Sequence, residues 1–350
     1  MTSAEQSVGP KRDTRRARQD YYDRIAAYGL SPAWERLRDL IASEPKSQCV
    51  PAIWRFKEVK AMLMESAELI SAEEAERRVL LLENPGLPGQ SRITQTLLAG
   101  LQLIMPGEIA AGHRHTASAI RFILDGENAY TTVEGERTSM LPGDFILTPN
   151  WSSHDHGNMT AAPMIWLDVL DVPIINYFET TFCESFDCPT QAVAHRDGDS
   201  IAFFGSGVLP DGASTLKSSP IINYPYARTR PILERLRAAG RVDERHGARL
   251  RYANPVNGGW TMPTMGAHLA LLPAGFRGQD YRATDGTIFV CVEGCGSTRV
   301  GDRDFEWSRG DIFVAPPWLR YAHATDVESV LFSISDRPAQ EALGIWREIV

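Results

Sequence analysis

The sequence predicts a mainly β protein that consists of two related antiparallel β-barrels preceded by a helical N-terminal region. Short apolar segments rich in β-branched and aromatic residues alternate with glycine turns, as expected of small barrels. The same pattern occurs twice, and the pairs Gly143-Asp144 and Gly310-Asp311 lie 167 residues apart, which indicates an internal duplication. Before about residue 85, apolar residues recur instead at helical spacing.

Residues 1 to 85 are expected to form a helical arm and connector. Helical spacing covers 14 to 29 and 31 to 43, with Ser31-Pro32 expected as the N-cap and first helical residue of the second segment. Ser71, followed by Glu73 and Glu74, predicts another helix start. We expect β-structure to begin near Ile93.

The first barrel is expected over residues 86 to 185. Predicted strands at 119 to 124, 129 to 133 and 143 to 149 are separated by turns at Asp125-Gly126 and Glu134-Gly135. A linker over 186 to 255 leads to a second barrel over 256 to 350. There, the turn glycines of the first barrel are repeated at Gly294, Gly301 and Gly310.

Four of the eight histidines form two close pairs, His113 with His115 and His154 with His156. Residues two apart on a strand face the same side, and a second strand can place the other pair opposite. Imidazoles arranged in this way favour Fe, Zn, Cu or Ni over Mg or Ca. Since His154 and His156 share a face, spacing leaves open which of them is the ligand. Taken singly, either pair would more often be ordinary surface or core residues.

The second copy lacks paired histidines, and only His323 lies near the position of the second pair. One imidazole cannot make a comparable metal site. We therefore expect the second barrel to serve structure and subunit contacts, with a separate ligand site as the alternative.

Composition bounds the remaining possibilities. A chain of 350 residues with 43% hydrophobic content can bury two compact cores. It has no run of 18 apolar residues and no apolar signal-peptide core, so we expect a cytoplasmic protein without a membrane partner. The five cysteines form no C-x-x-C motif and are expected to be reduced. A net charge of −8 argues against nucleic acid as a partner.

The histidine pairs and turn glycines together resemble the two cupin motifs. The residues that match are Gly107, His113, His115 and Gly126 in the first motif, and Gly135, Gly143, Pro149 and His154 in the second. Where cupins usually carry a glutamate ligand, this chain has Ala119. Three neutral imidazoles would leave the charge of a metal uncompensated and more of its coordination positions free for a substrate and O2.

Over roughly residues 30 to 350, the chain resembles the gentisate 1,2-dioxygenase family of bicupin ring-cleaving enzymes, which includes salicylate and 1-hydroxy-2-naphthoate dioxygenases. The resemblance rests on several stretches, among them Glu83-Asn84-Pro85-Gly86-Leu87, Met105-Pro106-Gly107-Glu108, His154-Asp155-His156-Gly157-Asn158 and Trp166-Leu167-Asp168-Val169-Leu170-Asp171-Val172-Pro173.

This resemblance implies one Fe(II) per chain, held by His113, His115 and His154, with His156 free to act as a catalytic proton carrier. It also implies a homotetramer. The implied reaction is O2-dependent cleavage of a 2-hydroxybenzoate, gentisate or a 5-substituted salicylate, between the carbons that bear the carboxyl and hydroxyl groups. 1-Hydroxy-2-naphthoate is an alternative substrate. A non-oxidative cupin isomerase or decarboxylase, and a cupin that only binds an aromatic acid, are alternative functions.

The resemblance also implies which residues bind the substrate. Arg121 and Arg77 occupy carboxylate-binding positions, which suit a planar guanidinium; Arg77 could instead pair with a glutamate of its own helix. Gln102 and Asp168 occupy pocket positions, where each would orient substrate or a ligand or satisfy an ordinary buried hydrogen bond.

The ring substituent would be selected by three further positions. Leu98 and Ser153 stand where many relatives carry a bulky aromatic side chain, and Gly100 is small. We expect a roomier or less polar pocket than that of a strict gentisate enzyme.

Overall fold

The computed structural model describes residues 14–212 and 216–349, and the chain divides into the units Met1–Lys46 and Ser47–Val350. The first unit contains the two predicted helices, α1 (Thr14–Ala26) and α2 (Ala33–Leu40). Their contact is polar, because the Trp34 indole donates to the Tyr22 hydroxyl at 2.9 Å. Helix α2 begins after Pro32 without a side-chain cap, so the cap expected at Ser31 is wrong.

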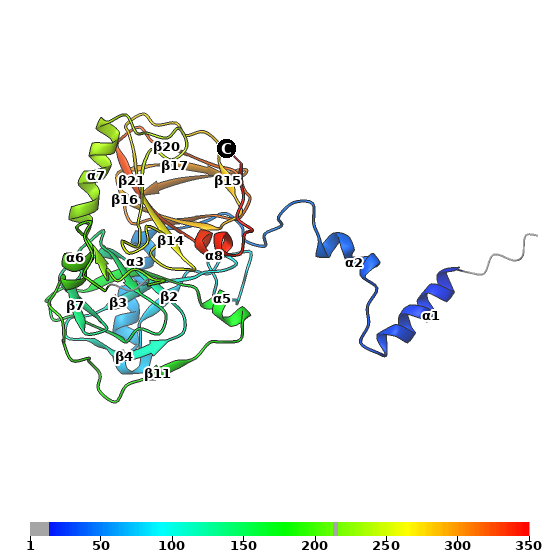
Figure 1. The fold of residues 1–350 in the computed structure, drawn as a ribbon, viewed down its shortest axis with the longest axis horizontal. Helices are drawn as coiled ribbons and strands as arrows, with labels where there is room; N and C mark the ends of the chain where they lie inside the picture. Colours follow the sequence, from blue (N-terminus) through cyan, green and yellow to red (C-terminus); the bar gives the residue numbers. More distant parts are fainter. Residues whose placement is uncertain (1–13, 213–215, 350) are drawn as a thin grey trace, which may run out of the picture. The chain divides into compact units, whose positions relative to one another are not determined.

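The second unit contains two cupin jelly-rolls, each formed by facing sheets rather than by one closed barrel (Figure 1). In the first jelly-roll a six-stranded sheet has the order β12-β8-β5-β10-β3-β2, and a five-stranded sheet has the order β11-β4-β9-β6-β7. Their bounds are β2 (Val79–Leu81), β3 (Leu98–Ile104), β4 (Ile109–His115), β5 (Ala119–Asp125), β6 (Tyr130–Val133), β7 (Glu136–Ser139), β8 (Phe145–Thr148), β9 (His154–Gly157), β10 (Met164–Leu170), β11 (Cys183–Ser185) and β12 (Asn223–Tyr224). The strands predicted for this half are confirmed.

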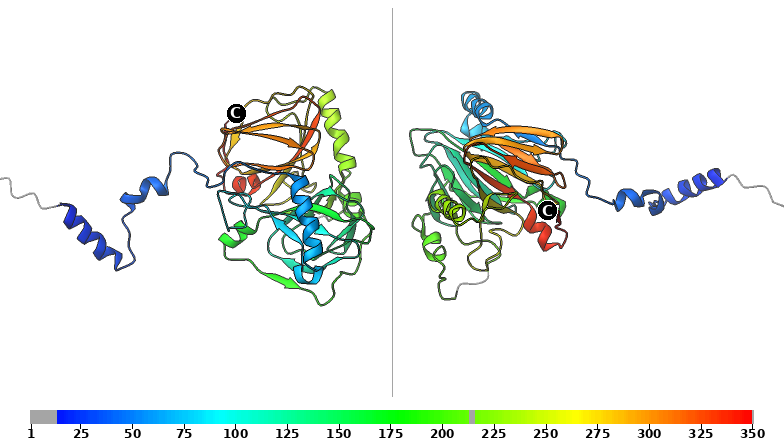
Figure 2. Two further views of the ribbon diagram at one scale, coloured as in Figure 1. Left: turned by 180° about the vertical axis from the view of Figure 1, so that it is seen from behind. Right: turned by 90° about the horizontal axis from the view of Figure 1, so that it is seen from above.

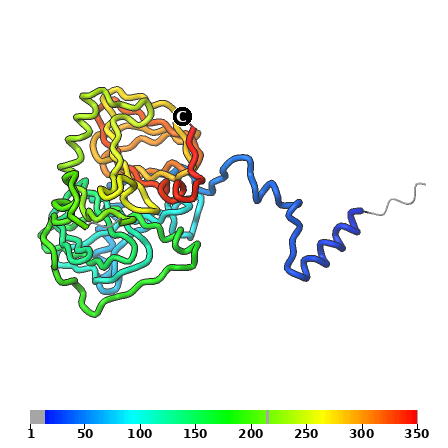
Figure 3. Tube along the Cα trace, in the orientation of Figure 1, coloured from blue at the N-terminus to red at the C-terminus, as the bar shows by residue number. Residues whose placement is uncertain are grey.

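The second jelly-roll repeats this plan with a six-stranded sheet, β1-β19-β16-β21-β14-β13, and a three-stranded sheet, β18-β17-β20. The tube trace separates the two halves by colour (Figure 3). The bounds are β1 (Ala52–Trp54), β13 (Ala248–Arg251), β14 (Gly266–Leu272), β16 (Thr287–Glu293), β17 (Cys295–Val300), β18 (Arg303–Ser308), β19 (Ile312–Ala315), β20 (Tyr321–Ala324) and β21 (Ser329–Ser335). Two further short strands of this half, β15 (Arg282–Ala283) and β22 (Glu348–Ile349), pair with each other as a separate antiparallel sheet.

The connectors exchange strands between the jelly-rolls. Strand β1 precedes the first jelly-roll but pairs with β19 of the second, and β12 precedes the second but pairs with β8 of the first. Each connector then continues as a helix, α3 (Phe56–Leu69) or α7 (Tyr226–Ala238), which Figures 1 and 2 draw beside the jelly-roll that follows it. The expectation that β-structure begins near Ile93 is therefore wrong, because edge strands of two or three residues are too short to show a periodic pattern.

The Gly-Asp pairs anchor these connectors. Gly143-Asp144 and Gly310-Asp311 both have glycine φ values of +87°. A side chain on either glycine would collide with an aromatic ring, Tyr226 at 2.6 Å or Phe56 at 2.5 Å. The aspartate of each pair accepts a 2.9 Å hydrogen bond from the backbone N–H of that same aromatic residue. The repeated pair thus caps the first turn of α7 in one half and of α3 in the other.

The main core lies between the two six-stranded sheets. Phe122 of the first sheet stacks on Phe332 of the second, with ring centroids 4.0 Å apart. Because side chains alternate along a strand, the opposite face of each sheet lines the interior of its own jelly-roll. The first interior packs around Trp166 and the second around Trp307.

The other helices are short: α4 (Ala72–Ala75), α5 (Val172–Tyr177), α6 (Asp199–Phe204) and α8 (Arg337–Ala342). The predicted start of α4 is confirmed, since Ser71 Oγ accepts from the backbone N–H of Glu74 at 3.1 Å. All five cysteines are free thiols. None of the helices in the described ranges has the length and apolar content needed to cross a bilayer.

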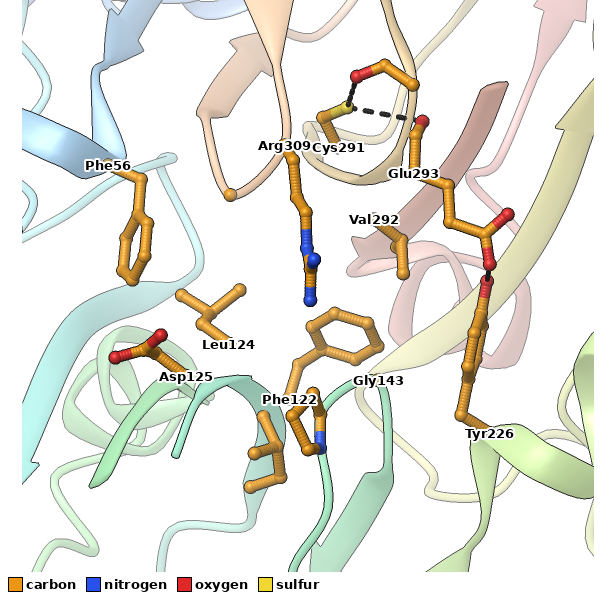
Figure 4. A pocket seen from close by; sticks show the side chains of 14 residues that line it. Phe56, Phe122, Leu124, Asp125, Gly143, Tyr226, Cys291, Val292, Glu293 and Arg309 are labelled. Carbon is orange, nitrogen blue, oxygen red and sulfur yellow. Dashed lines mark hydrogen bonds between the residues drawn. The ribbon is translucent and has the colours of Figure 1, made fainter. Parts of the chain in front are cut away.

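A cavity of about 560 Å³ opens where the two jelly-rolls meet (Figure 4). Phe122 and Leu124 lie on its lower side in this view, and Arg309 extends toward them. On its right, the Tyr226 hydroxyl donates to Glu293 at 2.5 Å. No histidine lines this cavity, so it lies apart from the cluster described next.

Candidate metal centre and substrate pocket

Three of the predicted histidines meet inside the first jelly-roll. His113 and His115 lie two apart on β4, and His154 lies on the neighbouring β9, where its backbone pairs with that of His113. One ring nitrogen from each lies within 4.8 Å of the others. Pairing of the two strands thus converts two distant sequence motifs into one three-imidazole cluster.

The ring orientations fit a metal. The Nδ1 atoms of His115 and His154 lie 2.7 and 2.9 Å from the carbonyls of Ala117 and Ser152, and Nδ1 of His113 lies 3.3 Å from that of Ala111. In His115 and His154, an Nδ1–H that donates to its carbonyl leaves Nε2 unprotonated, which is the form that binds a metal.

Burial keeps these rings neutral. It lowers the pKa of His113 to about 3, with Arg77 as the next cause, and it lowers the pKa of His154 well below its ordinary value. Neutral imidazoles do not need to lose a proton when a divalent cation binds. The donor set therefore fits a transition metal.

Arg77 lies directly beside the cluster. Its guanidinium donates to the Ala111 carbonyl at 2.8 Å and approaches Nδ1 of His113 to 2.5 Å. Within the described ranges it forms no ion pair with Glu73, Glu74 or Glu76, so the surface pairing considered as its alternative is absent there. A charged group next to the ligands remains available to a bound anion.

Arg121 lies deeper, on β5, and faces Asp168 on β10. Its Nε lies 3.1 Å from Asp168 Oδ1, although the two atoms are not aligned as a hydrogen bond. Nη1 donates to Thr148 Oγ1 at 2.5 Å, and the Trp166 indole donates to the other oxygen of Asp168 at 2.8 Å. This pair is buried, and burial raises the pKa of Asp168 while Arg121 opposes the rise. Among the described residues Nη2 of Arg121 has no partner.

His156 lies on the same strand as His154 but outside the cluster. Its Nδ1 is 2.8 Å from Thr131 Oγ1, whose hydroxyl donates to the Asp155 carbonyl at 3.3 Å. When the Thr131 hydroxyl donates to this carbonyl, Oγ1 accepts an Nδ1–H of His156, which leaves Nε2 as a proton acceptor. Burial, with Arg121 as the next cause, lowers the pKa of His156 well below its ordinary value.

The remaining predicted substrate residues lie away from the wide pocket. Leu98, Gly100 and Gln102 share one face of β3, and Gly100 pairs with Asp168 of β10. A side chain at Gly100 would meet Val79 Cγ1 at 2.5 Å, so the glycine lets β2 approach. Ser153 lies in the loop before β9, where its backbone N–H donates to Glu134.

A pocket of about 1050 Å³ leads to the cluster and is lined by His113, His115 and Arg77. Its apolar wall comes from residues that sequence reasoning missed, Leu170, Phe182 and Phe186. The two phenylalanines flank β11, which pairs with β4 directly opposite the two ligands. A strand of three residues is too short to show a periodic pattern in the sequence. This apolar wall could therefore not be predicted before the pairing of β11 with β4 was known.

Known proteins resemble this chain over nearly its whole length. Residues 100–170 match the cupin domain family. Gentisate 1,2-dioxygenase 1 of Aquipseudomonas alcaligenes is 49% identical over 95% of this chain and 96% of its own. A 5-aminosalicylate 1,2-dioxygenase of a Comamonas species is 34% identical over 93% of this chain and 88% of its own. The crystal structure of salicylate 1,2-dioxygenase from Pseudoaminobacter salicylatoxidans with gentisate superposes with a TM-score of 0.89, at 33% identity over 99% of this chain and 97% of that one.

Proposed function

Because this chain belongs to the gentisate 1,2-dioxygenase family of ring-cleaving enzymes, we propose that it uses O2 to cleave a 2-hydroxybenzoate, gentisate or a 5-substituted salicylate. The bond that breaks joins the carbons bearing the carboxyl and hydroxyl groups, and both atoms of O2 enter the product. The observation that carries this proposal is the three-imidazole cluster beside two arginines at the end of an open pocket.

The proposed cofactor is one Fe(II) per chain, held by Nε2 of His113, His115 and His154. Bound iron would supply electrons for O2 and positive charge for a chelating hydroxy acid. Three neutral ligands add no negative charge of their own, and Ala119 adds none where cupins often carry a carboxylate. This electrostatic balance favours an anionic substrate.

The chain's own residues would bind and orient the substrate. Arg121 offers its unpartnered Nη2 to the carboxylate, while Asp168 and Thr148 hold the guanidinium in place. Arg77 would add a second positive charge at the pocket side of the ligands. Charge-assisted hydrogen bonds from planar guanidinium groups suit a carboxylate.

His156 would carry the proton. Its Nε2 can accept the proton of the 2-hydroxyl group as the substrate binds, because Thr131 holds the other ring nitrogen as a donor. The same nitrogen can return that proton to the product. This role requires a neutral ring before substrate arrives, in keeping with the lowered pKa of His156.

The pocket's size and apolar wall also favour a second substrate, 1-hydroxy-2-naphthoate, whose added ring would lie against Phe182 and Phe186. The role proposed for Leu98, Gly100 and Ser153 is to shape the space around the ring substituent, and the role proposed for Gln102 is to orient the substrate. We further propose a cytoplasmic homotetramer, since symmetric assembly can cover exposed edge strands.

The decisive experiment measures O2 uptake by Fe(II)-loaded protein with gentisate, salicylate, 5-aminosalicylate and 1-hydroxy-2-naphthoate, with ultraviolet spectra recorded in parallel. Uptake of one O2 per aromatic ring lost is expected, and the His113→Ala variant should show neither signal. Turnover without O2 would instead indicate an isomerase or decarboxylase. Binding of an aromatic acid that is recovered unchanged would indicate a binding protein.

A further inference from the structure

The second jelly-roll contains a small internal cavity at the position equivalent to the metal centre. The backbones of Tyr281 and Tyr321 pair, as those of His113 and His154 do in the first jelly-roll, and Tyr321 lines the cavity. The cavity is lined by His246, Arg249, Ala270, Leu272, Phe289, Tyr321, His323, Leu331 and Ser333. Both of these positions carry a phenol in the second jelly-roll and an imidazole in the first. The second cavity therefore cannot bind a metal through paired imidazoles as the first would.

Arg249 brings a positive charge to this cavity from β13. Its guanidinium donates to Nδ1 of His268 at 2.9 Å, but within residues 14–212 and 216–349 no carboxylate lies within ion-pair distance of it. Arginine keeps its proton at any ordinary pH. The Arg249 side chain is partly buried, and burial lowers its pKa while the more distant Asp285 opposes this. A partly buried charge with no carboxylate at ion-pair distance favours an anion in this cavity.

The neighbouring polar groups point hydrogen-bond donors at the same space. Thr298 Oγ1 accepts from the Trp307 indole at 2.8 Å, and among the described residues the acceptor within reach of its own buried hydroxyl is Nδ1 of His323, also at 2.8 Å, which assigns the hydroxyl as the donor in that contact. His323 is buried and its pKa is lowered to about 3, by burial and then by Arg249, so the neutral ring carries its proton on Nε2. The Tyr321 hydroxyl has no partner among the described residues and can donate as well.

The size of the cavity selects the ligand. Its volume of about 10 Å³ is about the least that holds a single water, so a monatomic ion slightly larger than water fits with a small outward shift of the side chains that line it. A carboxylate, sulfate or phosphate would not fit without rearrangement of the aromatic walls. A water would satisfy the donors but would leave the charge of Arg249 uncompensated.

We propose that this cavity binds one halide-sized monovalent anion, chloride in the first instance, held by Arg249, Tyr321 and His323. The ion neutralises the partly buried guanidinium and ties β13 to β20. The second jelly-roll then carries a structural anion where the first carries its metal centre. This inference does not depend on the reaction proposed for the first jelly-roll.

Crystals of the full-length protein grown in sodium bromide test the site directly. Anomalous difference density is expected in the cavity, in contact with the Arg249 guanidinium. Bromide peaks confined to surface arginines, with water or nothing in this cavity, would overturn the proposal. The measurement uses the unaltered protein and so does not depend on whether any variant folds.

Thermal unfolding gives an independent test in solution. At constant ionic strength, replacement of gluconate by chloride should raise the Tm of the protein along a saturating curve, by about 5 °C when the ion exceeds its Kd 100-fold. Arg249→Met should abolish this response, whereas Arg309→Met, which removes an exposed arginine at the inter-barrel cavity, should retain it. Equal responses in all three proteins would mean a general salt effect and would refute the site.

Discussion

The two jelly-rolls carry the same threonine-histidine pair in the same place and use it differently. Thr131 with His156 and Thr298 with His323 are each separated by 25 residues and joined at 2.8 Å. In the first pair the threonine hydroxyl donates to a carbonyl and leaves the histidine Nε2 as an acceptor. In the second it accepts from an indole and leaves Nε2 as a donor.

One neighbour on each threonine therefore decides whether the histidine accepts or donates a proton in its cavity. An acceptor suits a substrate hydroxyl in the first jelly-roll, and a donor suits an anion in the second. The comparison teaches that duplicated scaffolds can diverge in chemistry while their backbone pairing stays the same.

The two jelly-rolls also differ in how their interior arginines, Arg121 and Arg249, are paired. Arg121 is held by Asp168 in the first jelly-roll. Pairing register puts Phe289 and Ser333 at the equivalent positions in the second, where the charge comes from Arg249 on another strand. Arg121 therefore has a carboxylate as counter-charge, whereas the proposal above gives Arg249 an anion in that role.

The largest expected effect is the loss of iron and activity when a histidine of the first jelly-roll, but not of the second, is replaced. His113→Ala should lower both iron content and O2 uptake by about three orders of magnitude, because a metal held by two imidazoles is lost readily. His323→Ala in the second jelly-roll should retain iron and activity. Metal analysis beside oxygen-electrode rates checks this, and equal losses in both variants would contradict a single metal centre.

A smaller effect is expected for the paired arginine. Arg121→Met should lower kcat/KM by about 100-fold through loss of a charge-assisted contact to the substrate carboxylate, mainly by raising KM. Arg249→Met should leave KM unchanged. Steady-state kinetics on both variants, with iron content matched, would show whether the two arginines differ as proposed; a normal KM in Arg121→Met would rule out its role.

An effect of about 10-fold on kcat is expected for Thr131→Val, by analogy with residues that orient a functional imidazole. Loss of the hydroxyl frees Nδ1 of His156, so KM and iron content should change little while kcat falls. Thr131→Ser should restore the rate, and Thr298→Val should not alter it. A fall in kcat that serine does not restore would point to packing instead.

The smallest effect concerns the pH dependence of stability. Asp336 precedes α8 as Asp171 precedes α5, and burial, followed by Asp285, raises the pKa of Asp336 to about 6. A raised carboxyl pKa means that the folded state binds the proton more tightly, so stability falls as the pH rises from about 4 to about 6 and is constant above.

Asp336→Asn should remove that fall, about 2 to 3 kcal/mol for a shift of about two units. Denaturant unfolding of both proteins between pH 4 and 7 measures the difference. Parallel curves for the two proteins would show that Asp336 does not titrate in this range.

Much of the fold was predictable because local chemistry carries it. Glycines with positive φ, such as Gly126 and Gly135, mark the hairpin turns, and their repetition marks the duplication. The connectors were not predictable in the same way. The short strands β1 and β12 each pair with a strand of the other jelly-roll. A segment of two or three residues is too short for its sequence to indicate a pairing partner elsewhere in the chain.

The sequence by itself determined that two β-rich halves exist and that only the first carries paired histidines, because residue type and spacing of two on a strand are local properties. Tertiary structure alone decided that His154 joins the cluster while His156 bonds to Thr131, and that β11 brings an apolar wall to the pocket. It also decided that, among the described residues, no carboxylate lies at ion-pair distance from Arg249. Each of these depends on which strands become neighbours, and the pairing of segments far apart in the chain is not a local property of residue type or spacing.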